Sequence, residues 1–213
     1  MYLQKNLKPG LPKPSNISGK FIQDPNLCSM PFIKTEFEGL YIFEPVVHND
    51  SRGYFFESYN QETWKKQGIN IHFVQDNQAK SSYGVVRGLH YQLNPHAQTK
   101  LVRALSGSIL DVVVDIRQGS PTFGRHFAIE LSAENCKQLL VPQGFAHGYA
   151  VLTGTAEVMY KCDAFYNKES EAGISYNDPQ LAIDWKIPAD KQVISEKDMK
   201  QPLFGEAKNN FRF

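Results

Sequence analysis

The 213-residue sequence predicts an all-β domain whose short strands form a sandwich or a barrel. Two observations carry this prediction. About ten short segments rich in Val, Ile, Phe and Tyr follow one another, and turn signals such as Asn49-Asp50 and Ser106-Gly107 separate them. In addition, neither a regular strand–helix alternation nor a glycine-rich nucleotide-binding loop is present, which disfavours Rossmann and P-loop domains.

Each expected strand is a short apolar or aromatic run that ends at a turn signal. We expect strands at Tyr41–Pro45, Tyr54–Ser58, His72–Val74, Val85–Tyr91, Lys100–Leu105, Ser108–Ile116, His126–Leu131, Gln138–Val141, Gly148–Leu152 and Glu157–Lys161. One helix is expected at Gln61–Gln67, because Asn60 is a favourable N-cap and Gly68 a favourable terminator. A weaker helical tendency follows Tyr176, toward the C-terminus.

Residues 1–29 differ from the rest of the chain. Pro, Gly, Ser and Lys are frequent there and interrupt any periodicity, so we expect a flexible leader. A patterned segment, PFIKTEFEGLYIFEP, follows Met30. The sequence therefore predicts one folded domain over residues 30–213.

The bulk composition is that of a soluble globular protein with a substantial core, since 41% of residues are hydrophobic and 21% charged. A net charge of +1 gives no indication of a nucleic-acid or membrane surface, so a few local cations must hold any anionic ligand. The N-terminus has no long apolar run, and we expect a cytoplasmic protein. Cys28, Cys136 and Cys162 are widely spaced, which favours free buried thiols in a reducing compartment.

The segment Gln75–Gln92 carries more polar residues than a core strand tolerates. Gln75, Asp76 and Asn77 are consecutive, so their side chains point to both faces. By strand alternation, one face would carry Val86, Gly88, His90 and Gln92, and the other Arg87, Leu89 and Tyr91. The pattern favours a barrel strand that lines a polar cavity, with His90 near its centre. A purely structural histidine is the alternative.

Two further strands carry charged residues among apolar neighbours. Lys100 shares a face with Val102 and Ala104, so it must meet an anion, lose its charge or extend to water at the strand edge. Asp111 lies within an apolar strand and needs a partner, and His147, which follows a tight turn, is a natural one.

Two tyrosines are candidates for a ligand site. Tyr160 is either a core tyrosine that needs one hydrogen bond or an acid that faces the cavity. The sequence pattern predicts that Tyr166 is exposed, so its ring could stack on a base.

Two polar motifs near the ends of the domain have both local and functional interpretations. Arg52 and Glu57 bracket a glycine-aromatic run, which suggests either a solvated surface hairpin or, for Arg52, a phosphate contact. Ser195 and Asp198 have the spacing of a capping box, and nothing in the spacing alone brings Asp198 to His90.

Ten sequence motifs in order, several longer than eight residues, carry a family resemblance. They are IFEP (42–45), DSRGYFFESYN (50–60), FVQDN (73–77), GVVRGLHYQ (84–92), QTKLVRALSG (98–107), DVVVDIRQGSPTFG (111–124), LSAEN (131–135), PQGFAHGYAVL (142–152), DPQLAIDW (178–185) and SEKD (195–198). From about Met30 to Met199 the chain resembles the dTDP-4-dehydrorhamnose 3,5-epimerases, dTDP-sugar epimerases of the cupin class. The resemblance implies a jelly-roll, or double-stranded β-helix, barrel with a few short helices, mainly C-terminal.

The resemblance also implies roles for individual residues. His90 would be the base that removes the sugar C5 and C3 protons, and Asp198 would pair with it. Tyr160 would deliver a proton on the opposite face, and Lys100 would stabilise the enolate oxygen. His147, backed by Asp111, would line the sugar pocket, and Tyr166 would stack on the thymine. Further substrate contacts are implied at Arg52, Glu57, Gln75, Asp76, Asn77, Arg87, Glu171 and Lys197.

The implied reaction converts dTDP-4-dehydro-6-deoxy-D-glucose into dTDP-4-dehydro-L-rhamnose through an enolate, without a cofactor. No metal is expected. Metal-binding cupins resemble one another in an HxH plus Glu cluster followed by a second His, whereas this chain has Gly88 and Gln92 at the positions two residues before and after His90. Family members are dimers that exchange N-terminal strands, so Arg52 and Glu57 would serve the neighbouring subunit's site.

Two other functions fit the same motifs. One is a related nucleotide-sugar enzyme that acts as a single-carbon (3- or 5-) epimerase or a ketoisomerase. The other is a non-catalytic cupin that binds a sugar nucleotide.

Overall fold

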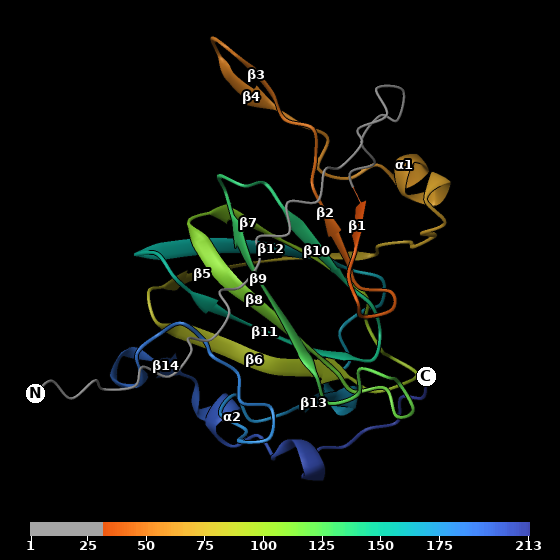
Figure 1. Ribbon diagram of the computed structural model, residues 1–213, viewed down its shortest axis with the longest axis vertical. Coiled ribbons are helices and arrows are strands. Elements are labelled where there is room, and N and C mark those ends of the chain that lie inside the picture. The colour runs from red at the N-terminus through yellow and green to blue at the C-terminus, as the bar shows by residue number, and fades with distance from the viewer. Residues whose placement is uncertain (1–31) are drawn as a thin grey trace, which may run out of the picture. The chain divides into compact units, whose positions relative to one another are not determined.

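Two β-sheets packed face to face form the body of the protein, as a computed structural model that describes residues 32–213 shows (Figure 1). The expected leader at 1–29 and the start of the domain at Met30 lie outside the described residues, and so does Cys28. Cys136 and Cys162 are free and buried.

Neighbouring strands run antiparallel in both sheets, apart from one short parallel strand, β14. The first sheet has the order β1 (Phe32–Lys34), β2 (Tyr41–Phe43), β10 (Gln138–Val141), β7 (Lys100–Ser106), β12 (Thr155–Cys162) and β5 (Gln75–Ser82). The second has the order β13 (Glu171–Gly173), β6 (Val85–Gln92), β11 (Phe145–Val151), β8 (Ser108–Asp115) and β9 (His126–Ser132), with β14 (Val193–Ile194) beside β6. This is the all-β jelly-roll architecture expected from the sequence.

The remaining elements are short. A separate hairpin joins β3 (His48–Asp50) to β4 (Gly53–Phe55), and in Figure 1 it stands away from the two sheets. The α-helices are α1 (Gln61–Lys66) and α2 (Glu196–Met199), and 3₁₀ turns lie at Lys168–Ser170, Ala189–Lys191 and Phe204–Glu206. As expected, the Asn60 side chain caps α1, and Gly68 follows its end with a positive φ of 79°.

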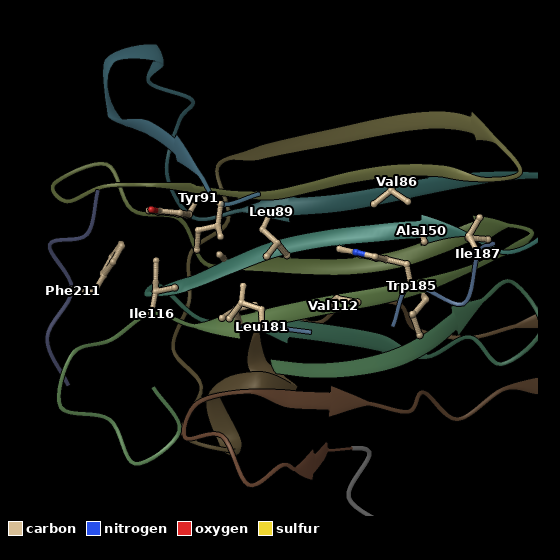
Figure 2. Packing of buried hydrophobic residues seen from close by; sticks show 14 of the residues in the cluster. Val86, Leu89, Tyr91, Val112, Ile116, Ala150, Leu181, Trp185, Ile187 and Phe211 are labelled. Carbon is tan, nitrogen blue, oxygen red and sulfur yellow. The ribbon is translucent and has the colours of Figure 1, made fainter. Parts of the chain in front are cut away.

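Strand β8 is buried along its whole length because a core lies on each of its faces. Ile109 and Val113 point into the core between the two sheets. Val112 and its face neighbours point the other way, where the C-terminal segment covers the second sheet through Leu181 and Trp185 (Figure 2). Apolar residues on both faces of this strand therefore reflect burial on both faces.

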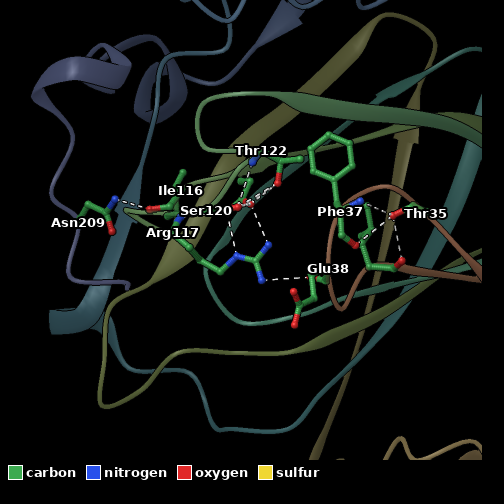
Figure 3. Close-up of polar contacts among 10 residues, drawn as sticks. Thr35, Phe37, Glu38, Ile116, Arg117, Ser120, Thr122 and Asn209 are labelled. Atoms are coloured by element: carbon green, nitrogen blue, oxygen red, sulfur yellow. Dashed lines mark hydrogen bonds and ion pairs between the residues drawn. The ribbon is translucent and has the colours of Figure 1, made fainter. Parts of the chain in front are cut away.

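A buried polar cluster ties the end of β8 to the turn at Glu38 (Figure 3). Asp115 is fully buried, and its carboxylate accepts hydrogen bonds from Arg117, Ser120 and Thr122. Arg117 also donates to the Glu38 carbonyl oxygen at 3.0 Å. Burial alone would raise the pKa of Asp115, but these hydrogen bonds outweigh it and lower the pKa.

We expect Asp115→Ala to lower the free energy of unfolding by roughly 3–5 kcal/mol, because it leaves the Arg117 charge without its partner. Since the folded-state pKa of Asp115 lies below the unfolded value, its ionisation contributes stability above about pH 3.9 that is lost as pH falls through the folded pKa. Urea unfolding at several pH values measures both effects. Asp184→Ala, which removes an exposed ion pair with Lys186, is the control and should change little.

All expected strands except His72–Val74 overlap observed ones. That expectation is wrong: residues 72–74 are irregular, and the strand is β5, which begins directly afterwards at Gln75. The apolar pattern alone does not indicate β5, because the strand is polar on both faces, whereas the polar residues of Gln75–Gln92 do predict a strand that lines a cavity. Its residues alternate between partly buried and exposed, one face turned toward a cavity and the other toward solvent.

The alternation expected for β6 is also wrong. Val86 packs with Leu89 in the core between the second sheet and the C-terminal segment, whereas Arg87 and His90 line one cavity on the other face. A β-bulge is the reason: His90 pairs with His147 and Arg87 with Tyr149, so two residues of β6 lie opposite Gly148 alone. The extra residue inverts the inward–outward pattern within one strand.

Gly88, within this bulge, needs to be glycine. Its φ is +129°, and a Cβ there would lie 2.5 Å from the Gly148 Cα. We expect Gly88→Ala to cost about 1–3 kcal/mol from backbone conformation alone, with the steric clash in addition. Thermal unfolding measures this loss. Gly154→Ala is the matched control, because nothing lies within 4 Å of a Cβ there.

Candidate active site

Two adjoining cavities lie between the sheets and share the walls formed by His90, Lys100 and Tyr160. The first cavity, of about 180 Å³, is lined in addition by Gln75, Asn77, Tyr91, Gln92, Gln98, Tyr166 and Glu171. The second, of about 130 Å³, is lined in addition by Ala79, Arg87, His147, Gly148 and Tyr149. Residues from β5, β6, β7, β11, β12 and β13 thus meet in one place.

His90 and Asp198 form a hydrogen-bonded pair, with 2.6 Å between His90 Nε2 and Asp198 Oδ1. Strand β14 lies beside β6 and leads into α2, which brings together residues 108 positions apart in the sequence. The Gly88 N–H donates to the other carboxylate oxygen of Asp198 at 3.4 Å. Burial alone would raise the pKa of Asp198, but the hydrogen bond with His90, the charge of His90 and the hydrogen bonds from Gly88 and Ser195 together outweigh it and lower the pKa. A buried carboxylate thus holds the His90 ring.

Half of the expected capping box is present. The Ser195 hydroxyl accepts from the Asp198 N–H at 3.1 Å, so Ser195 does cap α2. The Asp198 carboxylate, however, does not accept from the Ser195 backbone N–H as in a full capping box; it bonds His90 and the Gly88 N–H instead. One short helix therefore both closes its own N-terminus and presents a carboxylate to the cavity.

A second histidine–carboxylate pair lies in the adjacent strands. His147 Nε2 is 2.6 Å from Asp111 Oδ1, and both residues are buried. His147 is directly opposite His90 in the pairing of β11 with β6. The two pairs therefore sit side by side, although only His147 of the second pair lines a cavity.

Lys100 has no carboxylate within ion-pair distance among residues 32–213. Its Nζ lies 5.9 Å from the centre of the Tyr160 ring. Burial lowers the pKa of Lys100, and the nearby Cys162, Asp111 and Glu171 oppose the shift. The strand-edge alternative does not apply, because this side chain faces the cavities.

Tyr160 faces the same cavities from β12. Burial raises the pKa of its hydroxyl, with smaller contributions from Cys162 and Tyr149 that Arg87 partly opposes. The phenol is therefore protonated at neutral pH and can act as a proton donor.

The rim of the first cavity carries an exposed aromatic ring and an ion pair. Tyr166 is 55% exposed, and its hydroxyl donates to Glu171 at 3.2 Å. Lys197 Nζ lies 2.5 Å from the other Glu171 carboxylate oxygen. Burial alone would raise the pKa of Glu171, but the contact with Lys197, the hydrogen bond from Tyr166 and the charge of His90 together outweigh it and lower the pKa. Glu171 thus stays anionic and holds both neighbours.

Arg87 extends this polar surface around His90. Its Nε donates to the Ser81 hydroxyl at 3.1 Å, and no carboxylate pairs with it in the described part of the chain. It borders the second cavity and also a groove of about 380 Å³ that Lys197 lines. Arg87 is thus a cation available to an anionic group.

Three expected contacts lie elsewhere. Asp76 points away from the first cavity and pairs with its cross-strand neighbour Lys161 at 3.0 Å. Arg52 lies in the β3–β4 turn, paired with Asp50 at 2.6 Å, and Glu57 follows the hairpin. Within one chain, neither Arg52 nor Glu57 lines the cavities that contain His90.

Gln92, Gln98 and Tyr149 line the cavities but were not among the expected site residues. A signal for two of them was present in the sequence. Gln92 is two residues after His90, and Tyr149 is two residues after His147, so simple alternation puts each on the face of a candidate site residue. Polar residues at such positions in apolar strands indicate a cavity wall.

Among residues 32–213, no group of three or more His, Cys, Asp or Glu side chains is arranged to hold a metal ion. No helix in this part of the chain is long and apolar enough to cross a membrane.

Comparison with known proteins supports the resemblance seen in the motifs. The sequence model of the family described as dTDP-4-dehydrorhamnose 3,5-epimerase matches residues 34–206. A dTDP-4-dehydrorhamnose 3,5-epimerase of Shigella flexneri is 49% identical over 179 residues, which is 84% of this chain and 98% of the relative.

Solved structures agree. The epimerase of that name from Elizabethkingia anophelis NUHP1 has a TM-score of 0.79 and 54% identity, covering 82% of this chain and 96% of that one. The epimerase from Legionella pneumophila Philadelphia 1, in complex with dTDP-4-keto-L-rhamnose, has a TM-score of 0.79 and 46% identity, covering 82% and 93% of the two chains. The family inferred from the motifs is thereby confirmed, and the chain belongs to the dTDP-4-dehydrorhamnose 3,5-epimerase family.

Proposed function

We propose that the protein is a dTDP-4-dehydrorhamnose 3,5-epimerase, which converts dTDP-4-dehydro-6-deoxy-D-glucose into dTDP-4-dehydro-L-rhamnose. The observation that carries the proposal is the arrangement around the shared cavity walls. A carboxylate-held histidine, His90, shares these walls with Lys100, which pairs with no carboxylate of residues 32–213, and with a protonated tyrosine, Tyr160. These groups match the needs of proton abstraction next to a ketone.

His90 is the proposed base. A hydrogen on C3 or C5 of the sugar is acidic only because the C4 ketone converts the resulting carbanion into an enolate. The contact with Asp198 orients the His90 ring and stabilises the imidazolium that forms when the proton is taken. Positioned proton transfer of this kind typically contributes about 10²–10⁴-fold to the rate.

Lys100 is the proposed stabiliser of the enolate. The charge that leaves the C–H bond collects on the C4 oxygen, and an ammonium group placed there in advance needs no reorganisation. Because no carboxylate of the described chain pairs with Lys100, its charge is available to this oxygen. Partial burial strengthens the interaction, since the surroundings screen it less than water does.

Tyr160 is the proposed acid for the opposite side of the ring. Inversion requires that the new proton be added on the face of the ring opposite to the one from which the base removed the original proton. His90 belongs to β6 of the second sheet and Tyr160 to β12 of the first, so a sugar between the sheets meets them from opposite sides. The phenolate then regains its proton from solvent, and the imidazolium releases its proton to solvent.

The nucleotide is proposed to lie along the rim of the first cavity. The exposed ring of Tyr166 offers a stacking surface for thymine, and Arg87 and Lys197 are cations near enough to serve the diphosphate. His147 and Asn77 are proposed to contact the sugar end of the ligand.

We further propose a cytoplasmic homodimer in which the N-terminal strands are exchanged. Tyr54 and Phe55 of the β3–β4 hairpin are 60% and 71% exposed. Neighbouring large aromatic side chains exposed in this way are typical of a surface that a second subunit covers. Arg52 and Glu57 of the same region would then complete the neighbouring subunit's site. The free buried thiols of Cys136 and Cys162 suit a reducing compartment.

Incubation with dTDP-4-dehydro-6-deoxy-D-glucose in deuterated water tests the reaction. We expect deuterium at both C3 and C5, observed by mass spectrometry and NMR. Incorporation at one carbon only would favour the single-carbon epimerase instead. Binding without any incorporation would favour the non-catalytic sugar-nucleotide protein and contradict the proposal.

A further inference from the structure

Gln92 lines the first cavity, yet its amide is committed to the protein backbone. It is only 4% exposed at the end of β6. Its Oε1 accepts from the Asn167 N–H at 2.7 Å, and its Nε2 donates to the carbonyl oxygens of Phe165 at 3.3 Å and His96 at 2.6 Å. Phe165 and Asn167 are the two neighbours of Tyr166, so Gln92 holds the backbone on both sides of that ring.

Two more glutamines of the same cavity act on the same turn, residues 164–167. Gln75 Oε1 accepts from the Tyr166 N–H at 3.1 Å, while its Nε2 donates to Asn77 at 3.0 Å. Gln98 Nε2 donates to the Ala164 carbonyl oxygen at 2.8 Å. Each polar group of Gln75 therefore already has one protein partner, so Gln75 supports this turn while it lines the cavity.

These bonds fix an exposed aromatic side chain. Tyr166 is 55% exposed, and its hydroxyl is held by Glu171, so both the backbone and the far end of the ring are anchored. A ligand that stacks on a mobile ring loses affinity because it must order that side chain. A ring that is already ordered avoids this loss.

We propose that Gln92 is a positioning residue which, with Gln75 and Gln98, clamps the turn 164–167 so that Tyr166 forms a preorganised stacking platform for the base of a nucleoside diphosphate. This inference rests on the proposed function. It assigns Gln92 an effect on nucleotide affinity that operates through Tyr166, without contact between Gln92 and the reacting carbons.

The test uses Gln92→Leu, which keeps a similar volume and removes both hydrogen-bonding groups. Thymidine diphosphate is the probe, because it carries the base and phosphates without the sugar. By calorimetry we expect its Kd to rise about tenfold, with a parallel rise in KM and a kcat within about twofold of the wild type. Gln192→Leu is the matched control: Gln192 also donates to a loop carbonyl, that of Ile187, but lines neither cavity, and its variant should bind normally.

A double-mutant cycle separates positioning from general weakening of the fold. Tyr166→Ala should weaken thymidine diphosphate binding by about 5- to 150-fold, the usual range for losing one stacked base. If Gln92 acts through Tyr166, adding Gln92→Leu to this variant should cause no further loss. Loss of folded protein would lower the binding stoichiometry rather than the affinity.

Several outcomes would overturn the inference. These are an unchanged Kd in Gln92→Leu, a lower kcat at unchanged Kd, or additive losses in the double variant. A wild-type protein that does not bind thymidine diphosphate would contradict the proposed function itself. Normal wild-type binding with an unaffected Gln92→Leu variant would contradict only the clamp.

Discussion

Replacing His90 with alanine should abolish deuterium exchange at C3 and C5 while leaving the fold close to wild type. The expected loss in kcat is at least about 10²–10⁴-fold, the usual contribution of positioned proton transfer. The fold should tolerate the change because His90 faces a cavity and its side chain is about one-third exposed (32%). Exchange is measured by NMR in deuterated water and folding by circular dichroism and thermal unfolding.

The companion variant Asp198→Asn tests the pair. It keeps the shape of the side chain and removes the charge that holds the His90 ring, so kcat should fall while substrate affinity changes little. His126→Ala is a histidine control on β9, outside both cavities, and should retain full activity. Exchange that persists in His90→Ala would refute the assignment of the base.

Replacing Lys100 with methionine should lower kcat by about 10²–10³-fold, the range observed when one preorganised donor to a developing oxyanion is removed. The free energy of unfolding should rise or stay unchanged. Burial lowers the pKa of Lys100, so the folded protein bears a desolvation cost that an apolar side chain of similar length removes. The comparison therefore needs kcat and urea unfolding on the same protein samples.

Lys80→Met is the matched control, because Lys80 lies on β5 in an exposed ion pair with Glu157 and lines neither cavity. It should leave both kcat and stability near wild type. A Lys100→Met variant with normal kcat would contradict the proposed enolate contact. A variant that unfolds readily would indicate that Lys100 has a structural partner.

The β-rich class and most of the strands could be predicted from the sequence, because apolar periodicity and turn residues are local properties. Strand β8, for example, is mostly apolar, and it is buried on both faces. Strand β5 could not be predicted in this way. Its residues are polar because one face turns to a cavity and the other to solvent, a distinction made only when β12 pairs beside it.

The candidate site divides in the same manner. The reactive residues could be identified one by one from the sequence. The pairing of His147 with Asp111 could also be predicted, because a carboxylate within an apolar strand needs a partner. The partner of His90 could not be derived from spacing, since Asp198 lies 108 residues away and also fits a capping box. In the sequence, only the resemblance to the family implies this pairing.

The fold class, the family and the reactive side chains can therefore be inferred from the sequence, because they depend on local pattern and on motif order. The directions in which those side chains point depend on the tertiary structure. Because of the bulge at Gly88, Arg87 and His90 face the same cavity, although simple alternation would place them on opposite faces. The pairing of β14 with β6 brings Asp198 next to His90. Register and long-range pairing arise from the packing of whole sheets, and no short stretch of sequence contains that information.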